Sequence, residues 1–392
     1  LSVSFEAPRL GRLDRVTVTG LFGTYDQRTD QDRVATAISP RSIERADVSA
    51  NDFQVRAVAD KLVSDVQLEF GLDVNGRVGL EAHDIAVAYD LSGAVVGQTD
   101  NLSIDSASRT DTGLFVQALT QAAPAVQLAG GVRVDVVRSA NDGGFFGDRS
   151  ITNSALAGLG SMTVGPFDGL SLTGQVSRGF RDPTLSDRFF RGPSGRGFIT
   201  GNPDLEPETS LQFDLGARYA RSRVRVTAYV YHYRIRNLVE RFDLGDENFA
   251  FRNRGRAHIT GVELEGQIDL GQGYALELAA NLSRGDSPDD DEPLDDIGAP
   301  SLSAVVRKAL ADRGAAYVRV AGYARDDRPG PSEIAMPGWV DVDAGASWRF
   351  SPRLEIRAAA RNLLNQAYYA SPDPRWVYAP GRSASVTLVT GF

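Results

Sequence analysis

The sequence predicts an all-β fold, a transmembrane antiparallel up-and-down β-barrel, and three observations support this prediction. Apolar and polar residues alternate over most of the chain. The connections between the predicted strands alternate between short and long. The chain also ends on an alternating strand whose last residue is Phe392. A strand with a period of two can place one face in lipid and the other in water, so the pattern suits the wall of a barrel.

Length, composition and charge narrow the class of protein. The chain has 392 residues, a net charge of −9 and no cysteine. A single barrel can run to this length, whereas an ordinary globular domain is shorter. No run of about 18 apolar residues occurs, which rules out a transmembrane helix but leaves room for a barrel of short, half-polar strands. The charge argues against nucleic acid as a partner, and the missing cysteine excludes disulfides and thiolate metal sites.

Alternation recurs along the chain with little helical periodicity. Val132, Val134 and Val136, for example, interleave with Arg133 and Asp135. This pattern predicts strands with one apolar face. We expect strands, about 17 in number, at residues 1–8, 13–27, 50–62, 65–90, 107–121, 124–138, 152–163, 168–179, 208–220, 222–243, 246–270, 273–284, 300–311, 314–325, 338–350, 353–365 and 381–392. The stretch 65–90 fits either one long strand or two short ones.

The lengths of the connections distinguish a barrel from a soluble sheet. Alternation alone is equally consistent with the half-buried strands of a sandwich. Short connections lie at residues 122–124, 165–168, 221–222, 271–273 and 351–352. Long connections lie at residues 27–50, 139–151, 179–208, 285–299, 326–338 and 366–380. Tight turns at one rim and long loops at the other are the layout of an outer-membrane barrel.

The odd number of predicted strands indicates whether the predicted barrel is complete. A single-chain bacterial barrel has an even number of strands. If the last strand runs toward the periplasm, strict alternation makes the first predicted strand run the same way, whereas the first strand of a complete barrel runs outward. We therefore expect residues 1–392 to form one domain, a barrel that is incomplete at its N-terminus.

Five segments of the second half of the chain carry recognisable motifs. They occupy residues 177–189, 201–210, 253–265, 361–368 and 380–383. Together, and in this order, they resemble motifs of the TonB-dependent receptor family of the bacterial outer membrane. The terminal Phe392 resembles the insertion signal of outer-membrane barrels. The predicted strands before residue 177 show the same alternation but carry no motif of the family.

The resemblance implies a barrel of about 22 strands, an N-terminal plug that closes it and a short box that engages TonB. About 17 strands that end at the last one would begin at the sixth, which runs toward the periplasm, in agreement with the strand parity. No plug, no energy-coupling box and no earlier strands are visible in the sequence. The resemblance therefore implies the C-terminal part of a receptor barrel, either as a fragment or as one piece of a split receptor.

The motifs also have physical interpretations. Asn202, Pro203 and Asp204 form a turn sequence, because proline fixes φ and the side chains beside it bond back to the backbone. Gly255 and Gly261 permit bends in a strand. We therefore expect these motifs to serve barrel architecture and not ligand contact.

The segment 178–198 is the best candidate for ligand capture. It combines arginines, which pair with carboxylate, catecholate or phosphate oxygens, and phenylalanines, which stack on flat ligand surfaces. The candidate residues are Arg178, Arg181, Arg188, Phe189, Phe190, Arg191, Arg196 and Phe198. The alternative interpretation is that these arginines bind lipopolysaccharide or acidic neighbours in the loops.

Catalytic and metal sites are not predicted. His83, His232 and His258 lie on three separate predicted strands, without a nucleophile at motif spacing. No phosphate-binding loop, zinc spacing or paired-acid signature occurs. The acidic segment 286–296 lacks calcium-loop spacing and contains two prolines, so we interpret it as a solvated loop. We expect no enzyme activity and no cofactor.

The family resemblance implies an outer-membrane receptor that binds a scarce metal chelate at its extracellular loops and imports it with energy from a TonB-type complex. A ferric siderophore is the first expectation, followed by cobalamin, haem or a glycan. Outer-membrane lipid and lipopolysaccharide would be further partners. Two alternatives remain: a passive porin, which predicts conductance in planar bilayers, and a soluble β-rich binding module, which predicts a monomer without detergent.

Overall fold

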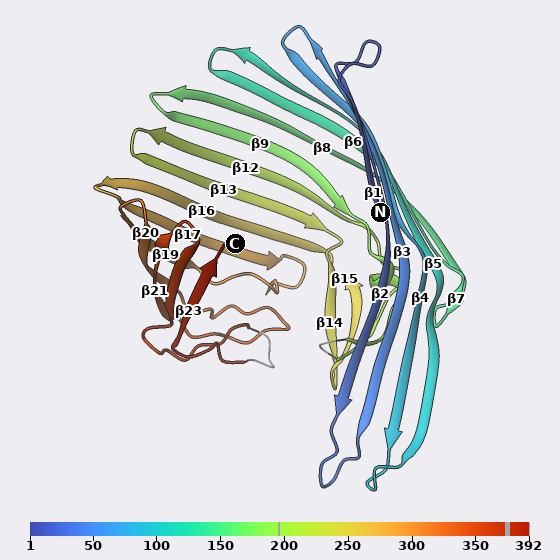
Figure 1. The fold of residues 1–392 in the computed structure, drawn as a ribbon. Helices are drawn as coiled ribbons and strands as arrows, with labels where there is room; N and C mark the ends of the chain where they lie inside the picture. Colours follow the sequence, from blue (N-terminus) through green and yellow to red (C-terminus); the bar gives the residue numbers. More distant parts are fainter. Residues whose placement is uncertain (195–196, 373–376, 392) are drawn as a thin grey trace.

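The computed structural model describes residues 1–194, 197–372 and 377–391. One antiparallel sheet of 19 strands curls into an incomplete cylinder (Figure 1). A second sheet of four short strands and one short helix arise from the long loops. In the described ranges we find no helix with the length and apolarity needed to span a bilayer.

The elements have the following bounds. The long strands of the main sheet are β1 (Ser2–Ala7), β2 (Arg15–Arg33), β3 (Ser42–Val63), β4 (Val66–Tyr89), β5 (Val95–Ala123), β6 (Val126–Asn141), β8 (Arg149–Phe167), β9 (Leu170–Arg181), β12 (Glu208–Arg221), β13 (Val224–Arg236), β16 (Arg256–Gly271), β17 (Tyr274–Ser287), β19 (Ser301–Leu310), β20 (Gly314–Tyr323), β21 (Trp339–Ser351), β22 (Leu354–Arg361) and β23 (Ser383–Thr390). The shorter elements are β7 (Gly143–Gly144), β18 (Glu292–Pro293), β10 (Arg191–Ser194), β11 (Gly197–Thr200), β14 (Val239–Gly245), β15 (Asn248–Asn253) and α1 (Leu185–Phe189).

The strand prediction is confirmed in number and order. Without the two-residue strands β7 and β18, the main sheet has 17 strands, and each pairs antiparallel with the next long strand in the chain. The stretch 65–90 is the single strand β4, whose pairing with β5 is interrupted by register shifts near Leu80. The predicted strands 222–243 and 246–270 each divide in two, because β14 and β15 leave the wall and join the small sheet.

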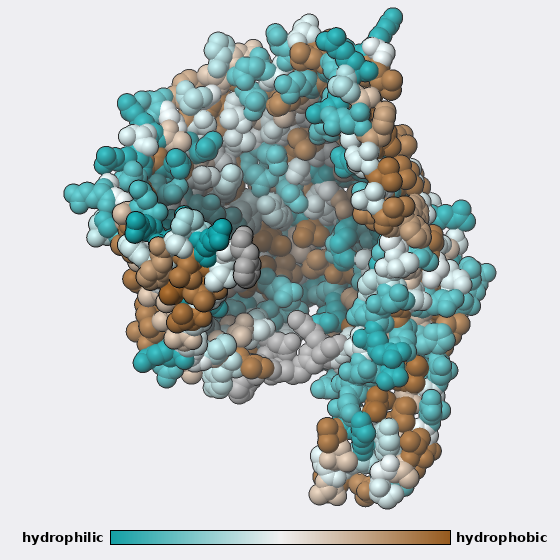
Figure 2. All heavy atoms as spheres, in the orientation of Figure 1, coloured by the Kyte–Doolittle hydropathy of each residue, from teal (hydrophilic) through white to brown (hydrophobic). Residues whose placement is uncertain are grey.

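The two faces of the wall differ in polarity as the alternation predicts. Val132, Val134 and Val136 are 55%, 53% and 46% exposed, whereas the intervening Asp135 is buried. Such exposure of large apolar side chains is unfavourable in water and favourable in lipid. Figure 2 shows apolar atoms along the outer edge of the N-terminal strands and a hollow at the centre of the molecule. The outward face is therefore the lipid-facing one.

A soluble sandwich would require a second sheet over these apolar residues. Among the described residues the only other sheet is the small one, which is built from loop segments. Val340, Val386 and Leu388 of the C-terminal strands are exposed as well. The alternative of a soluble β-rich module is therefore not supported by the fold.

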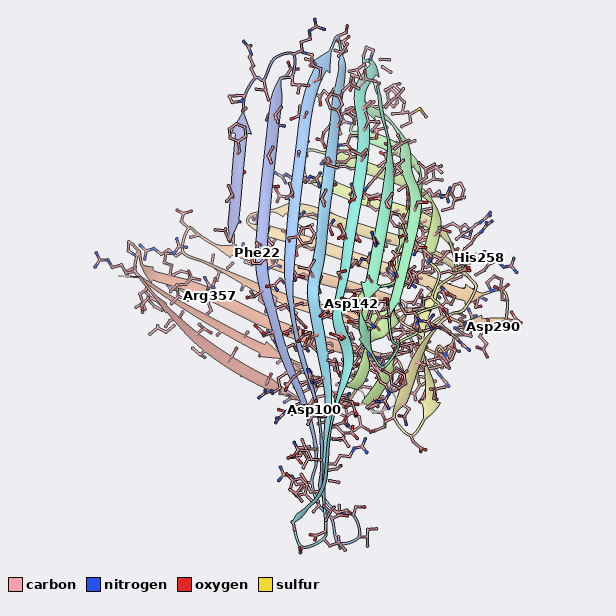
Figure 3. All side chains as sticks on the ribbon, turned by 90° about the vertical axis from the view of Figure 1, so that its right-hand side faces the viewer. Phe22, Asp100, Asp142, His258, Asp290 and Arg357 are labelled. Atoms are coloured by element: carbon pink, nitrogen blue, oxygen red, sulfur yellow. The ribbon has the colours of Figure 1, made fainter. Side chains whose placement is uncertain are left out.

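The long connection predicted at 27–50 is wrong in its extent. Strands β2 and β3 remain paired up to Arg33 and Ser42, and β4 and β5 up to Tyr89 and Val95. Figure 3 shows this double hairpin projecting far beyond the rest of the wall. Its polar sequence looks like a loop, but the backbones pair as strands, and ion pairs link them: Arg28 with Asp47 at 2.6 Å, Arg45 with Asp30 at 2.5 Å and, at the turn, Arg41 with Asp32 at 2.6 Å.

The cylinder remains open between its first and last strands. In the described part of the chain, β1 pairs only with β2, and β23 only with β22. The two termini therefore lie on opposite sides of a gap in the wall (Figure 1).

The motif at 361–368 ties the last loop to the start of β23. Asn362 is 3% exposed and has a φ of 48°. Its side-chain oxygen accepts a hydrogen bond from the Gln366 backbone N–H at 2.9 Å, and its side-chain amide donates to the carbonyls of Gln366 and Pro380. The Asn365 side chain accepts a hydrogen bond from the Arg382 backbone N–H at 3.0 Å. Both motifs of the last hairpin thus serve architecture, as their turn chemistry predicts.

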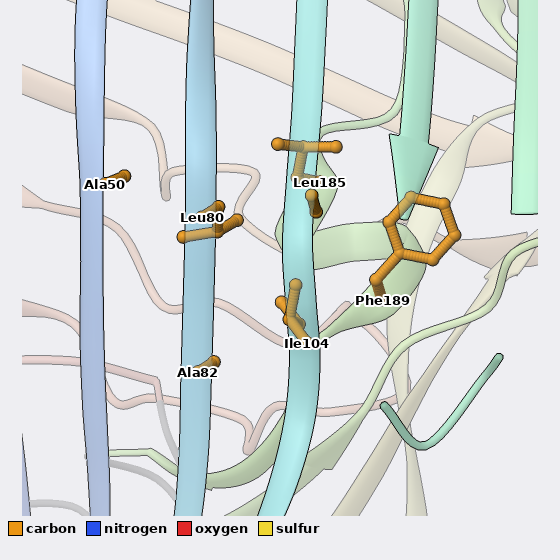
Figure 4. Close-up of a cluster of buried hydrophobic side chains, with 7 residues drawn as sticks. Ala50, Leu80, Ala82, Ile104, Leu185 and Phe189 are labelled. Atoms are coloured by element: carbon orange, nitrogen blue, oxygen red, sulfur yellow. The ribbon is translucent and has the colours of Figure 1, made fainter. Parts of the chain in front are cut away.

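The loop between β9 and β12 folds back into the cylinder and forms its hydrophobic core. Thr184 caps α1, since its hydroxyl accepts a hydrogen bond from the Asp187 backbone N–H and the Asp187 carboxylate accepts one from the Thr184 N–H. The helix then places two apolar side chains against β3, β4 and β5 (Figure 4). The buried cluster consists of Ala50, Leu80, Ala82, Ile104, Ala107, Leu185 and Phe189.

Arg188 holds the two halves of this loop together from inside the protein. Its side chain is 1% exposed, and its Nη1 donates to the carbonyls of Pro203 at 2.9 Å and Leu205 at 2.7 Å. The carboxylate of Asp182, equally buried, lies 3.7 Å from Nη2. Burial lowers the pKa of Arg188, and the charge of Asp182 opposes this shift. We call the interaction of these four residues the loop anchor.

We expect Asn362→Ala to lower the free energy of unfolding by about 2–4 kcal/mol, because alanine loses the side-chain hydrogen bonds and is strained at a positive φ. Urea unfolding in detergent micelles measures the change. Asn362→Gly is the matched control, since it loses the same hydrogen bonds without the strain, and it should cost less. Equal losses in the two variants would contradict the contribution of the backbone conformation.

We expect Arg188→Met to release the loop, because it removes the hydrogen bonds to the Pro203 and Leu205 carbonyls and one of the two arginines that lie 3.7 Å from the buried Asp182 carboxylate, a local cost of about 2–4 kcal/mol. Chymotrypsin cleavage next to Phe189 in the folded protein reports the release. Arg181→Met removes an arginine whose side chain is 44% exposed, and should leave the cleavage rate nearly unchanged. Protection of the loop in Arg188→Met would show that the anchor does not hold it.

Candidate functional site

A cavity inside the cylinder lies between the inward loop and the inner face of β4, β5 and β6. Its volume is about 480 Å³. The residues that line it are Asn75, Arg77, Arg109, Asp111, Arg133, Asp135, Val137, Phe180, Arg181, Asp182, Thr184, Leu185 and Ser186. Charged side chains dominate this set, with four arginines against three aspartates. We call this site the inner cavity.

Ion pairs fix the arginines on the strand side of the inner cavity. Arg77 pairs with Asp52 of β3 at 2.7 Å, and its guanidinium lies 4.5 Å from the centre of the Tyr25 ring. Arg109 pairs with Asp111 at 2.8 Å through the same face of β5. An arginine held in this way presents its remaining surface in a fixed orientation.

Arg109 also connects the wall to the loop anchor. Its Nη1 donates hydrogen bonds to the backbone carbonyls of Asp182 at 3.2 Å and Pro183 at 2.7 Å. On the next strand, Arg133 bridges the carboxylates of Asp135 and Asp73. The floor of the inner cavity is therefore a network of alternating charge on three neighbouring strands.

Arg181 lines the opposite side of the inner cavity, at the end of β9. It pairs with Glu208 of β12 at 2.7 Å and with Asp187 of α1 at 3.2 Å. The arrangement can bind a ligand with several oxygen atoms, because positively charged guanidinium groups and negatively charged carboxylates converge on one volume.

The structure distributes the predicted ligand residues over different roles. Arg181 lines the inner cavity, whereas Arg188 and Phe189 are buried in the loop anchor and the hydrophobic core. Phe190 packs against that core. Arg178 is exposed on the outward face of β9. Arg196 lies outside the described residues.

The remaining two predicted residues contact each other in the small sheet. The guanidinium of Arg191 lies 4.7 Å from the ring centre of Phe145 and 4.8 Å from that of Phe198. It also pairs with Asp84 of β4 at 3.1 Å. Burial raises the pKa of Asp84, and the charge of Arg191 opposes this shift. These contacts join the small sheet to the projecting hairpin.

The sequence interpretation missed three arginines of the inner cavity as site residues. Arg77, Arg109 and Arg133 occupy inward positions on β4, β5 and β6. The alternation of the strands identifies Arg133 as inward, but nothing in the sequence shows that the register aligns these strands. Register is set by pairing across strands that are distant in the chain, so a list of motifs does not reveal it.

The acidic segment 286–296 forms ion pairs with arginines of neighbouring loops. Arg254, whose side chain is 2% exposed, pairs with Asp290 at 3.0 Å and with Glu292 at 2.8 Å. The Arg256 side chain lies 2.8 Å from Asp289 and lowers the pKa of its carboxyl group. The carboxylates of this segment thus organise the loop between β17 and β19.

Comparison with known proteins identifies the family of the chain. The model of the family described as "TonB dependent receptor-like, beta-barrel" matches residues 7–363. The vitamin B12 transporter BtuB of Vibrio vulnificus is 26% identical over 257 residues, which are 64% of this chain and 39% of that protein. The pesticin receptor of Yersinia enterocolitica is 26% identical over 237 residues, 53% of this chain and 34% of the receptor. The chain therefore spans well under half the length of these relatives.

Solved structures show the same fold. The copper transporter OprC aligns with a TM-score of 0.82 at 16% identity, covering 100% of this chain and 65% of that one. The ferric citrate transporter FecA aligns with a TM-score of 0.76 at 11% identity, covering 99% of this chain and 60% of that one. Fold, motifs and family match agree, and the chain belongs to the TonB-dependent receptor β-barrel family of the bacterial outer membrane.

Proposed function

We propose that the protein is part of an outer-membrane receptor that binds a scarce metal chelate and imports it with energy from a TonB-type complex. Membership of a family of receptors and transporters, and not of enzymes, supports the general role. The chelate and the energy-coupling partner are proposals, as is the assignment of residues 1–392 to one part of a larger barrel. The inner cavity is the observation that carries the proposal for this chain.

The arginines of the inner cavity can bind the oxygens of an anionic chelate. The lining of the cavity has four arginines, and carboxylates of the lining and of the neighbouring elements already orient them. Pre-oriented guanidinium groups bind the oxygens of carboxylate or catecholate groups without a further loss of side-chain entropy. A ferric siderophore or ferric carboxylate has this chemistry and remains the first choice, with cobalamin, haem and glycans behind it.

The names of similar proteins include more than one type of ligand and leave the substrate open. They include a transporter for ferric citrate and another for vitamin B12. The first is an anionic iron chelate and the second a large cobalt cofactor, so both ligand types belong in the panel to be tested.

We expect the double variant Arg109→Gln/Arg133→Gln to weaken binding of the true ligand by about tenfold or more, because each arginine is a charge-assisted donor. The experiment measures binding of ferric catecholate, ferric citrate, cobalamin and haem to the full receptor from its native host. Arg319→Gln is the matched control: Arg319 also faces inward and pairs with Asp341 at 3.1 Å and Asp343 at 3.2 Å, but it lies outside the inner cavity.

Unchanged binding of every ligand by the double variant would contradict a role for the inner cavity. Ligand uptake that persists after loss of the proton gradient, together with steady conductance in planar bilayers, would instead identify a passive porin. A receptor requires uptake to stop when the gradient collapses.

A further inference from the structure

The outward face of the wall changes from apolar to basic along one group of neighbouring strands. On β13 the outward positions are Val226, Ala228 and Val230, followed by His232, Arg234 and Arg236. Arg234 lies ten residues beyond Val224, about 33 Å of strand, which at a tilt of about 40° rises about 25 Å. That height equals the apolar band of a barrel, so the basic residues begin at the outer surface of the bilayer.

Adjacent strands bring further basic residues to the same level. Leu211 of β12 lies opposite Arg178 of β9 on one side and Arg234 of β13 on the other. Arg234 in turn lies opposite His258 of β16. Strands are about 4.8 Å apart, so Arg178 and Arg234 are about 10 Å apart at their backbones, within joint reach of one phosphorylated headgroup. Figure 3 shows His258 at the margin of the molecule that forms the rear of Figure 1.

Three of these arginines carry charge that the protein itself does not neutralise. In the described part of the chain, no carboxylate lies within 4.0 Å of the guanidinium groups of Arg178, Arg234 and Arg236. Arg234 is held in place by a hydrogen bond from its Nε to His232 Nε2 at 3.2 Å, and His232 Nδ1 is 2.8 Å from the Thr260 hydroxyl. We call Arg178, His232, Arg234, Arg236 and His258 the outer basic cluster.

An apolar depression adjoins the outer basic cluster on the membrane side. It has a volume of about 550 Å³, and its outward-facing side chains include Met162, Val176, Phe213, Leu215 and Val230. Gly160 and Gly174 have no side chains that would fill the depression. His232 and Thr260 form the end of the depression next to the outer basic cluster. A methyl group added at Gly160 would meet no atom within 4 Å. The depression is therefore open at Gly160, and its apolar side chains can contact an acyl chain.

We propose that this surface binds one phosphorylated lipid of the outer leaflet, of the lipopolysaccharide type, with a phosphate at the outer basic cluster and an acyl chain in the apolar depression. Arginine pairs with phosphate through two parallel hydrogen bonds, and its weakly hydrated guanidinium suits the headgroup region. The apolar depression directly below the cations distinguishes such a lipid from free phosphate, which would gain nothing from it. The same arrangement favours the lipid-binding alternative for Arg178 over a role in ligand capture.

Native mass spectrometry of the full receptor, purified from the outer membrane and exchanged into detergent, tests this proposal. The probes are a lipid A with two phosphates, its dephosphorylated form, and inorganic phosphate as a competitor. The wild type should bind one molecule of phosphorylated lipid A, and Arg178→Gln/Arg234→Gln/Arg236→Gln should bind it about tenfold more weakly or worse. Arg234→Gln alone should weaken binding in the same direction, should the triple variant fail to fold.

Arg138→Gln is the matched control. Arg138 also follows a row of outward valines, on β6, but its cross-strand neighbours are Thr110 and Thr152 instead of basic residues. Its binding of lipid A should match that of the wild type. Gly160→Leu fills the apolar depression from an open position and should weaken binding of lipid A while the cluster stays intact.

Several results would overturn the proposal. They are wild-type binding by the triple variant, an equal loss in Arg138→Gln, and equal binding of the dephosphorylated lipid. Displacement of lipid A by millimolar inorganic phosphate, with no effect of Gly160→Leu, would show a simple anion site and would overturn it as well.

Discussion

A strand in a bilayer must satisfy its backbone hydrogen bonds within the protein, since hydrocarbon offers neither donors nor acceptors. This constraint determines the architecture. It forces the strands of the wall to pair with their neighbours, and in the described part of the chain β1 and β23 pair on one side only. Because the backbone is satisfied by strand pairing, the polarity of each side chain decides which face it occupies. Val132, Val134 and Val136 therefore face outward, while Arg133 and Asp135 face inward.

Much of the fold could be predicted from the sequence, because the two-residue period of a strand is visible as an alternation of apolar and polar residues. The number of long strands, their order and the sorting of connections into turns and loops are all confirmed. The prediction failed where a segment without an alternating pattern nevertheless forms strands. Residues 27–50 and the start of β5 are polar and look like loops, yet they are largely strands, linked by ion pairs such as Arg28 with Asp47. Both sides of such a hairpin are in water, so no apolar row marks it.

The candidate site was only partly predictable. Arginines and phenylalanines between 178 and 198 suggest ligand capture by composition, but composition does not distinguish a side chain that meets a ligand from one that meets its own loop. Arg188 pairs with buried backbone carbonyls, and Arg191 lies between two aromatic rings. The inner cavity depends on the register that places Arg77 directly opposite Arg109, with Arg133 further along β6 opposite Phe115, and register is a property of the folded sheet.

The double hairpin of β2 to β5 projects beyond the rest of the wall at one side of the cylinder (Figure 1). Arg28 and Asp30 on β2 each face an opposite charge on β3, and Asp32 pairs with Arg41 just before β3, so the fields of these pairs largely cancel a short distance away. An approaching solute therefore feels little long-range attraction from the β2–β3 hairpin, whereas residues 81–105 of the neighbouring hairpin carry five carboxylates and no lysine or arginine. The shape and the hydrogen-bonding groups of the β2–β3 hairpin act only after collision, so its contribution to discrimination lies in the time that a molecule stays bound.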